Sequence, residues 1–427
     1  MRICFVLPYA YPLFEPGAGG RFGGAEFRAV SFGRQLAGMA GYEIAFAVRD
    51  QGQPHRQRID GIDVFTMPDD TSWDRRLLDR LRGSIHAESR FPWLKIDRWR
   101  PGLAWELPAA VACLAARALR RQVQERRFAN PARRRVLEEI GADVYASFGT
   151  HHVTAEVVAF CGRRRCRSVL FVSSDYDLLE QYHRGSSLRN IYGERGHVCH
   201  FGLAHADLIV VQTARQQALL QNRFGRSSVL IRNPIDLCQP APPPARRPAE
   251  GFALWIGKAD DYKRPELCLE LARRCHEIPF MMIVNRAAPN VFETVSAQRP
   301  PNVEMVEQVP QSQIDDYYRR AAVLVNTSAY EGMPNTFLQA GMHGIPVVTL
   351  VVDPDGMLSA SRCGFCAGGD LEAMAADVTR IWRGADEAVE FSRNIRAYVE
   401  RHHDLAGRAA ELDRALTNLV GGEKLVG

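Results

Sequence analysis

The sequence predicts an α/β protein with two parallel sheets, one in each half of the chain. Short apolar runs alternate with helix-like segments, a pattern that is typical of parallel strands covered by helices. The chain has 427 residues, which is more than a single hydrophobic core usually serves. The segment 239–248 contains five prolines and separates the two series of apolar runs. Because proline continues neither a helix nor a central strand, this segment is the expected domain linker.

The apolar runs give the expected order of elements. In the first half, the expected strands are 2–7, 42–48, 143–147, 168–173, 208–211 and 229–231. A helix is expected over 26–39, after a glycine-rich loop. In the second half, the expected strands are 252–256, 280–284, 303–306, 323–325 and 346–351. From about residue 371 the pattern is helical to the end of the chain.

These elements divide the chain into three parts. We expect an N-terminal α/β domain over 1–240, a C-terminal α/β domain over 249–395, and a helical segment over 396–427.

The composition is typical of a globular protein, with 46% apolar and 24% charged residues. No apolar run reaches the roughly 18 residues of a membrane-spanning helix, and the run at 2–8 lacks the cleavage site of a signal peptide. Ten cysteines are scattered without a disulfide framework. We expect reduced thiols and a cytoplasmic protein, and we interpret Cys363-Gly-Phe-Cys366 as structural thiols rather than a redox or zinc half-site.

The positive charge is concentrated in one half. Residues 1–240 contain 34 of the 54 basic and 24 of the 49 acidic residues, a balance of +10, and the remainder carries −5. Between 69 and 135, basic and aromatic residues are interleaved, which suits an anionic surface such as lipid head groups. They are Arg75, Arg76, Arg80, Arg82, Arg90, Lys95, Arg98 and Arg100, with Trp73, Phe91, Trp93, Trp99 and Trp105.

This half is therefore expected to meet an anionic partner, either a membrane surface or an acidic acceptor. A membrane partner would place the protein peripherally at the inner membrane face. A well-solvated arginine-rich surface is the open alternative, and nucleic acid is a less favoured partner.

The most specific pattern is the segment 331–348, which reads EGMPNTFLQAGMHGIPVV. It predicts a loop, a helix and then a strand, with Pro334 and Asn335 at the helix start, Asn335 as its cap, and Gly344 and Pro346 at its end. Amides at a helix start, together with the positive end of the helix dipole, form a site for a diphosphate. We expect the backbone amides around Met333 to Thr336 to point into that site.

This segment resembles the signature of the retaining glycosyltransferases of the GT-B fold, the large family four, in which two glutamates precede a Gly-x-Pro-Val-Val strand. The resemblance implies that Glu331 contacts hydroxyls of the donor sugar. Gln339 stands where the family glutamate usually binds the ribose, and its carboxamide retains hydrogen bonding without charge assistance. We therefore expect altered nucleotide binding. The further donor contacts implied here are Gly332, Met333, Pro334, Asn335 and Thr336.

A second match follows the first strand of the expected donor domain. Gly257 and Lys258, followed by Lys263 and Arg264, resemble the family's Gly-Arg and Lys-Gly pair. The resemblance implies that these residues contact the donor and that two cations neutralise the leaving diphosphate in place of a metal ion. Lys258 stands where arginine is usual, so a bidentate contact becomes a point charge. Together with Glu331, the two lysines are the candidate catalytic residues.

Two further matches extend the resemblance over most of the chain. The turn 233–236, Asn-Pro-Ile-Asp, is similar to the turn that closes the family's first domain, and as an Asn-Pro turn its main role is structural. Gly23, Gly24 and Glu26 open the first helix and resemble the family's N-terminal glycine loop. Glycines there allow the backbone to approach the donor phosphate or the acceptor. The resemblance implies two Rossmann-like domains that face each other across a cleft, with the C-terminal helices returning to the first domain. It also implies acceptor binding by the first domain and donor binding by the second.

One departure from the family lies in the first domain. Many relatives carry a histidine after a strand in the middle of that domain, near the reacting sugar. Here the strand at 168–173 leads to Ser174 or Asp175 at that place. The resemblance leaves the histidine's role to Asp175, to His151 or His152 after the strand at 143–147, or to no residue.

Two readings compete with a metal-independent sugar transferase. Asp175-Tyr-Asp177 and Asp353-Pro-Asp355 match the Asp-x-Asp of metal-dependent, single-domain sugar transferases. The other motifs fit the metal-independent type, so no metal ligand and no cofactor are expected; the nucleotide diphosphate sugar is the donor substrate and a saccharide or lipid-linked molecule is the acceptor. The second alternative is a catalytically silent protein of the same fold that binds a nucleotide or a partner, which Gln339 and the missing histidine favour.

Overall fold

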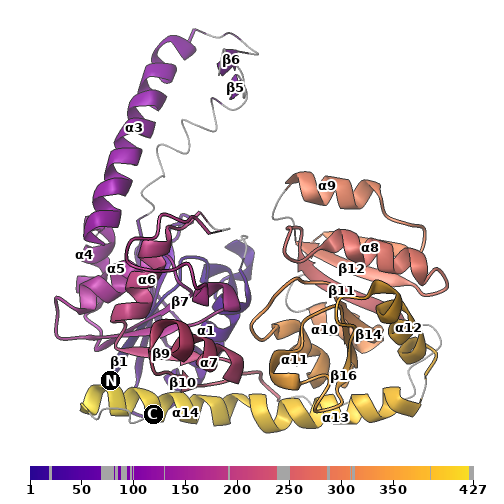
Figure 1. Cartoon of the computed structure of the whole chain (residues 1–427). Helices are drawn as coiled ribbons and strands as arrows, with labels where there is room; N and C mark the ends of the chain where they lie inside the picture. Colours follow the sequence, from indigo (N-terminus) through magenta and orange to yellow (C-terminus); the bar gives the residue numbers. More distant parts are fainter. Residues whose placement is uncertain are drawn as a thin grey trace.

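The chain folds into two α/β domains joined by two crossings, as Figure 1 shows. The structure is a computed structural model of the whole chain. The residues that it describes are 1–18, 22–68, 81, 85–87, 94–96, 99, 101–128, 130–190, 193–237, 251–285, 289–307, 309, 313–384 and 386–422. The proline-rich linker at 239–248 and most of the basic and aromatic stretch at 69–100 lie outside these residues.

The first domain contains an eight-stranded sheet in the order β10-β9-β8-β7-β1-β2-β4-β3. All neighbouring strands are parallel except β3 and β4, which form an antiparallel pair at one edge. The strands are β1 (Arg2–Val6), β2 (Glu43–Arg49), β3 (Arg56–Ile59), β4 (Ile62–Met67), β7 (Val144–Phe148), β8 (Arg167–Phe171), β9 (Leu208–Val211) and β10 (Val229–Leu230). The central strands are buried on both faces because helices cover the sheet on each side.

Helices cover both faces of this sheet, and one long helix leaves it. They are α1 (Gly24–Ala37), α3 (Leu103–Arg127), α4 (Pro131–Ile140), α5 (His152–Cys161), α6 (Gly196–His205) and α7 (Ala214–Phe224). In Figure 1, α3 rises away from the domain, and the short strands β5 (Ile85–Ala87) and β6 (Leu94–Ile96) lie near its far end. None of the helices in the described part of the chain is both long enough and apolar enough to cross a membrane.

The second domain has a six-stranded parallel sheet in the order β13-β12-β11-β14-β15-β16. Its strands are β11 (Phe252–Lys258), β12 (Phe280–Asn285), β13 (Val303–Glu307), β14 (Ala321–Asn326), β15 (Val347–Thr349) and β16 (Gly364–Cys366). The helices on its two faces are α8 (Pro265–Arg274), α9 (Pro289–Ala297), α10 (Ile314–Arg320), α11 (Asn335–Met342) and α12 (Leu371–Trp382). The two parallel sheets that the sequence predicts are therefore present.

Some strands are not among those predicted. β3 and β4 form a hairpin whose sequence carries several charged residues, and β16 coincides with the Cys363-Gly-Phe-Cys366 segment. β16 is an edge strand beside β15, and Cys363 is fully buried under it. The cysteines whose side chains the structure describes are all free thiols.

The last two helices span both domains. α13 (Asp386–His403) packs on the second domain, where Ile395 and Val399 contact α11. α14 (Leu405–Gly421) packs on α1 of the first domain and contributes Leu412 and Leu416 to its core. In Figure 1 the two helices form a continuous band along one side of the molecule. The chain thus passes between the domains a second time at residues 403–405.

The two crossings are hydrogen-bonded to each other. The amide of Ile235 donates to the carbonyl of His403 at 2.8 Å, and the amide of Leu405 donates to the carbonyl of Ile235 at 3.1 Å. The His403 side chain is fully buried, and its Nδ1 donates to the carbonyl of Asn233 at 2.7 Å. Burial lowers the pKa of this imidazole to about 3. The ring is therefore held neutral at the point where both crossings meet.

The buried histidine predicts a loss of stability in mild acid. Below its ordinary pKa of 6.5 the unfolded chain binds a proton at His403, while the folded chain does not until about pH 3. Stability is therefore full above about pH 6.5 and falls with pH through that window, by about 2 kcal/mol between pH 7 and pH 5. His403→Asn retains a donor toward Asn233 but cannot titrate. Urea unfolding at several pH values is expected to show a weaker acid dependence in the variant; equal slopes would refute this assignment.

Candidate active site at the domain interface

Two lysines follow the first strand of the second domain. Lys258 is the last residue of β11, and Lys263 lies five residues later, before α8. Gly257 precedes Lys258, and a Cβ there would lie 2.6 Å from the indole ring of Trp255, so only glycine fits beside this buried ring. The Trp255 indole donates to Thr327 Oγ1 at 3.0 Å, which ties β11 to the loop after β14. The lysines are thus carried by rigid structure.

Lys263 forms an ion pair with Glu331. The contact joins Lys263 Nζ to Glu331 Oε1, which also accepts a hydrogen bond from Ser328 Oγ at 2.8 Å. Both side chains are largely buried, with exposed fractions of 17% and 14%. A pair with so little solvent around it resists screening and fixes both groups in place. The two residues that the signature predicts at the sugar and the diphosphate therefore lie together.

Arg264 supports the loop that carries Glu331. Its guanidinium donates to the carbonyl of Thr327 at 2.7 Å and to that of Ser328 at 2.9 Å. Its backbone is left-handed, with φ of 50°, at the residue that precedes α8. The guanidinium is therefore engaged by backbone, and its contact with a donor stays a prediction.

The start of α11 differs in detail from the prediction. The cap residue is Pro334, and Asn335, predicted as the cap, is the first helical residue, with its side chain turned to the other domain. The amide of Met333 donates to Gln212 Oε1 at 3.3 Å, so it does not face the site as expected. The amides of Asn335 and Thr336 donate to no group in the described residues. Fewer amides than predicted are therefore available to an anion at this helix start: those of Asn335 and Thr336, but not that of Met333.

The glycine loop of the first domain meets this helix directly. Asn335 Nδ2 donates to the carbonyl of Gly24 at 3.2 Å. A Cβ on Gly23 would lie 3.6 Å from Lys258 Nζ, so this ammonium lies against the loop. Glu26 stabilises the start of α1 because its Oε2 accepts from the amide of Gly23 at 2.8 Å. Predicted residues from both domains are thus brought together.

Asn233 joins the crossing to the same helix start. Its Nδ2 donates to the carbonyl of Met333 at 3.0 Å and to Asn335 Oδ1 at 3.2 Å. The sequence indicated a turn with a structural role, and the structure adds a side-chain contact to the second domain. Gly332 is equally constrained, since a Cβ there would lie 2.5 Å from Gln212 Nε2 and 2.9 Å from Gln216 Nε2.

Three tyrosines, which the sequence did not single out, stack beside the ion pair. Tyr330 precedes Glu331, and its ring lies between Tyr176 of the first domain, 4.8 Å away, and Tyr262, 5.6 Å away. Lys263 Nζ lies 5.3 Å from the centre of the Tyr262 ring. The two domains are therefore joined by an aromatic contact as well as by the polar contacts. No spacing pattern links a residue at 176 with one at 330.

The side chain of Gln339, one turn along α11, is oriented by a buried tyrosine. The hydroxyl of Tyr318 donates to Gln339 Oε1 at 3.0 Å, and Tyr318 is fully buried. The carboxamide is only partly exposed. This donor suits a carboxylate at position 339 as well as the carboxamide. The ribose contact predicted for this position stays a prediction.

The loop after β8 carries the residues considered in place of a histidine. Ser174 caps a short 3-10 helix by accepting from the amide of Tyr176 at 3.2 Å. Asp175 accepts from Arg215 Nε at 2.9 Å and from Gln216 Nε2 at 3.2 Å. Both side chains therefore organise the first-domain side of the interface. Neither contacts Lys258 or Lys263 through the hydrogen bonds of the described residues.

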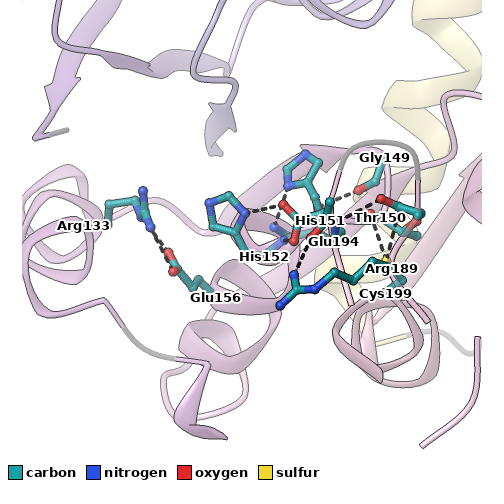
Figure 2. A network of polar contacts seen from close by, with 12 residues as sticks. Arg133, Gly149, Thr150, His151, His152, Glu156, Arg189, Glu194 and Cys199 are labelled. Carbon is teal, nitrogen blue, oxygen red and sulfur yellow. Dashed lines mark hydrogen bonds and ion pairs between the residues drawn. The ribbon is translucent and has the colours of Figure 1, made fainter. Parts of the chain in front are cut away.

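The two histidines at the start of α5 have protein partners, as Figure 2 shows. His151 caps α5: its Nε2 donates to the carbonyl of Phe148 at 2.8 Å and its Nδ1 accepts from the amide of Thr154 at 3.4 Å. Burial, aided by neighbouring His152, lowers the pKa of His151 and favours the neutral ring. The Nδ1 of His152 lies 2.7 Å from Glu194 Oε1 at a half-exposed position. The sequence left open which of them faces a ligand, and His152 is the accessible one.

The carboxylates of the two Asp-x-Asp matches are engaged elsewhere. Asp177 accepts from the amides of Thr150 and Ser173, each at 2.7 Å, and Asp353 accepts from the amide of Leu358 at 2.7 Å. No cluster of three or more metal-ligating side chains occurs in the described residues. Near the lysines, burial raises the pKa of Asp260 to about 6, against the lowering effect of Lys263 and Lys258.

Asp355 forms a further contact between the two domains. The sequence pattern indicated only a metal-binding role for this residue, as part of the second Asp-x-Asp match. It pairs with Arg232 Nη1 at 2.8 Å and accepts from the amide of Ala214 at 2.9 Å and that of Arg215 at 3.3 Å. A carboxylate from the second domain thus caps α7 of the first and interacts favourably with the positive end of its dipole. Its partners lie more than 100 residues away in sequence, so local patterns carry no signal for it.

The chain thus has two Rossmann-like domains of the GT-B type, and the candidate site lies where the carboxyl edges of both sheets meet. Residues 252–383 match the family Glycosyl transferases group 1, which confirms the resemblance for the second domain. No curated protein matches the chain by sequence.

Solved structures share the fold over much or all of the chain. Sucrose-phosphate synthase from Thermosynechococcus elongatus aligns over 99% of this chain and 100% of its own, with a TM-score of 0.66 and 15% identity. Anabaena HepE, solved with UDP, aligns over 98% of this chain and 100% of its own, with a TM-score of 0.59 and 13% identity. S. aureus TarM, solved with UDP, fondaparinux and α-GlcNAc-glycerol, aligns over 67% of this chain and 58% of its own, with a TM-score of 0.54 and 15% identity.

The packing at Gly332 gives a test of the interface. Gly332→Ala is expected to lower the free energy of unfolding by roughly 1–3 kcal/mol, because the methyl group displaces two buried glutamine side chains that are already hydrogen-bonded. Gly421→Ala, where a Cβ meets nothing within 4 Å, is the control and should change stability little. Urea unfolding measures both. Equal values for the two variants would show that the domains do not pack at Gly332 as described.

Proposed function

We propose that the protein is a glycosyltransferase that moves a sugar from a nucleoside diphosphate donor to a saccharide or lipid-linked acceptor. The single observation that carries this proposal is the meeting of Lys258, Lys263 and Glu331 with the glycine loop at residue 23 and the start of α11. Such a site has two cations and two amides for phosphates and one carboxylate for sugar hydroxyls. The match of residues 252–383 to the group 1 glycosyl transferases supports it.

The lysines are suited to stabilising the leaving diphosphate without a metal ion. Of the 54 basic residues only four are lysines, and two of these stand at 258 and 263. Lys258 has no ion-pair partner in the described residues, and Lys263 is paired with Glu331. A diphosphate would place negative charge beside both ammonium groups in a site of low solvent exposure, where the interaction is strong. We propose that this charge develops on the diphosphate as the glycosidic bond breaks.

The proposed reaction retains the configuration of the transferred sugar. In this mechanism the acceptor attacks from the side of the leaving diphosphate, which demands strong stabilisation of that group. The first domain, which faces the lysines through its glycine loop, would supply the acceptor site. UDP is the first nucleotide to examine because the HepE and TarM structures contain it. A thermal-shift screen of UDP, GDP and ADP sugars would identify the base.

The second candidate is a silent protein that binds nucleotide without transfer. Gln339 in place of a glutamate favours it, and so does a loop after β8 that offers Ser174 and Asp175 instead of a histidine. The ion pair between Lys263 and Glu331 favours the enzyme, because a nucleotide-binding scaffold has no need of a carboxylate at the sugar.

Release of nucleoside diphosphate from the donor separates the two candidates. The wild-type protein is expected to release UDP, or the nucleotide identified in the screen, in an acceptor-dependent reaction. Lys263→Ala should lower that rate by about 100-fold or more, since one stabiliser of developing charge is typically worth this much. Arg273→Ala, which removes an exposed cation on α8, is the matched control and should retain the rate. Binding without release in the wild-type protein would establish the silent alternative.

The same reaction tests metal independence. We expect EDTA to leave the rate unchanged, because no step in the proposal uses a cation other than the two lysines. A rate that falls with EDTA and returns with Mg²⁺ or Mn²⁺ would contradict the metal-independent proposal.

The identity of residue 339 gives a test of nucleotide binding. Gln339→Glu is expected to tighten UDP binding by about five-fold, because hydrogen bonds from ribose hydroxyls to a carboxylate gain charge assistance. Gln339→Leu removes the acceptor and should weaken binding. Isothermal titration calorimetry with UDP measures both variants. Tighter binding by the leucine variant than by the glutamate variant would show that this side chain does not reach the ribose.

A further inference from the structure

Along residues 104–119 of α3, the exposed side chains that the structure describes are all apolar and lie on one face. The exposed residues described between 104 and 119 fall on an arc of about 140° at 100° per residue. The sequence between 103 and 116 contains a single charge, Glu106, which is buried on the opposite face with Leu103 and Ala110. The apolar stripe consists of Ala104, Trp105, Pro108, Val111, Ala112, Ala115, Ala116 and Leu119.

This stripe is not an ordinary solvated surface. Three of its large side chains are mostly exposed, Trp105 at 62%, Val111 at 59% and Leu119 at 65%. Isolated exposed apolar residues are normal, but a continuous apolar stripe about 22 Å long indicates a surface that is covered by another molecule or by a membrane. Figure 1 shows α3 extending beyond the first domain, with β5 and β6 near its first turns. Trp99, 70% exposed, lies four residues before α3.

The other end of α3 meets a cluster of arginines. The sequence of α3 from 117 to 127 contains five arginines and one glutamate. Just beyond it, Arg134 and Arg164 share the carboxylate of Glu138, and Arg135 and Arg165 are exposed beside them. Two cations on one carboxylate leave a net positive charge. The end of α3 is held against α6, because Phe128 stacks on Phe201 with ring centres 4.1 Å apart.

We propose that α3 docks the protein on an anionic lipid bilayer. The apolar stripe and exposed Trp105 enter the boundary between head groups and acyl chains, and the arginines at residues 134, 135, 164 and 165 pair with lipid phosphates. A second copy of the chain is disfavoured as the occupant because the stripe is wider than the narrow seam of two paired helices. The inference does not depend on sugar transfer.

Vesicle co-sedimentation tests the proposal. Wild-type protein is expected to bind phosphatidylcholine vesicles that contain roughly one-third phosphatidylglycerol, and to bind pure phosphatidylcholine more weakly. The double variant Val111→Glu with Leu119→Glu should lose at least ten-fold in binding. The matched control, Val420→Glu with Leu188→Glu, changes the same residue types at exposed positions outside α3 and should bind like the wild type.

A second variant keeps the test independent of α3 folding. Arg164→Gln with Arg165→Gln leaves the stripe intact and should reduce binding to the anionic vesicles several-fold while leaving binding to phosphatidylcholine unchanged. UDP affinity and thermal unfolding should be the same in all variants, which separates this proposal from the proposed function. The proposal is overturned if both variants bind as the wild type does. It is also overturned if the wild type ignores vesicles and forms a dimer that Val111→Glu with Leu119→Glu dissociates.

Discussion

The arrangement of the site depends on hydrogen bonds from first-domain side chains to the backbone of one second-domain residue. Gln212 accepts from the amide of Met333, and Asn233 donates to its carbonyl. The backbone N–H and C=O of Met333 are thus both held by side chains of the other domain, and the loop that carries Glu331 cannot move without breaking these contacts. Because backbone groups buried without partners are costly, the two domains stabilise each other at the residue that precedes the helix start.

The same contacts explain what sequence patterns could and could not predict. Most of the strands follow from local signals, because strand ends and tight turns use recognisable residues, whereas the roles expected of Lys258, Lys263, Glu331 and the glycine loop come from the family resemblance. The predicted start of α11 is wrong by one residue. The pattern favours Asn335 as the cap, but its side chain instead forms a hydrogen bond with the first domain. Local preference yields where a partner from another domain is available.

Residues whose partners are distant in the sequence show no local sequence pattern that predicts their contacts. Asp355 caps a helix 141 residues earlier in the chain, and Tyr176 stacks on Tyr330. Arg28 is similar: its guanidinium is buried among three phenylalanine rings and donates to the carbonyls of Val172 and Ile231. These carbonyls end the strands that lead to the interface, so a core residue sets the position of surface loops. A sequence read alone would place an arginine on the outside.

The return of α14 to the first domain makes that domain discontinuous in the chain. Tyr42 bonds to Asp413, 371 residues later, and Leu412 and Leu416 complete the core beside α1. During synthesis, the apolar surface of the first domain that α14 covers therefore stays exposed until the second domain has been synthesised. The second domain, whose strands are contiguous, can fold in that interval. The core of the first domain is therefore completed only by residues that are synthesised after the second domain.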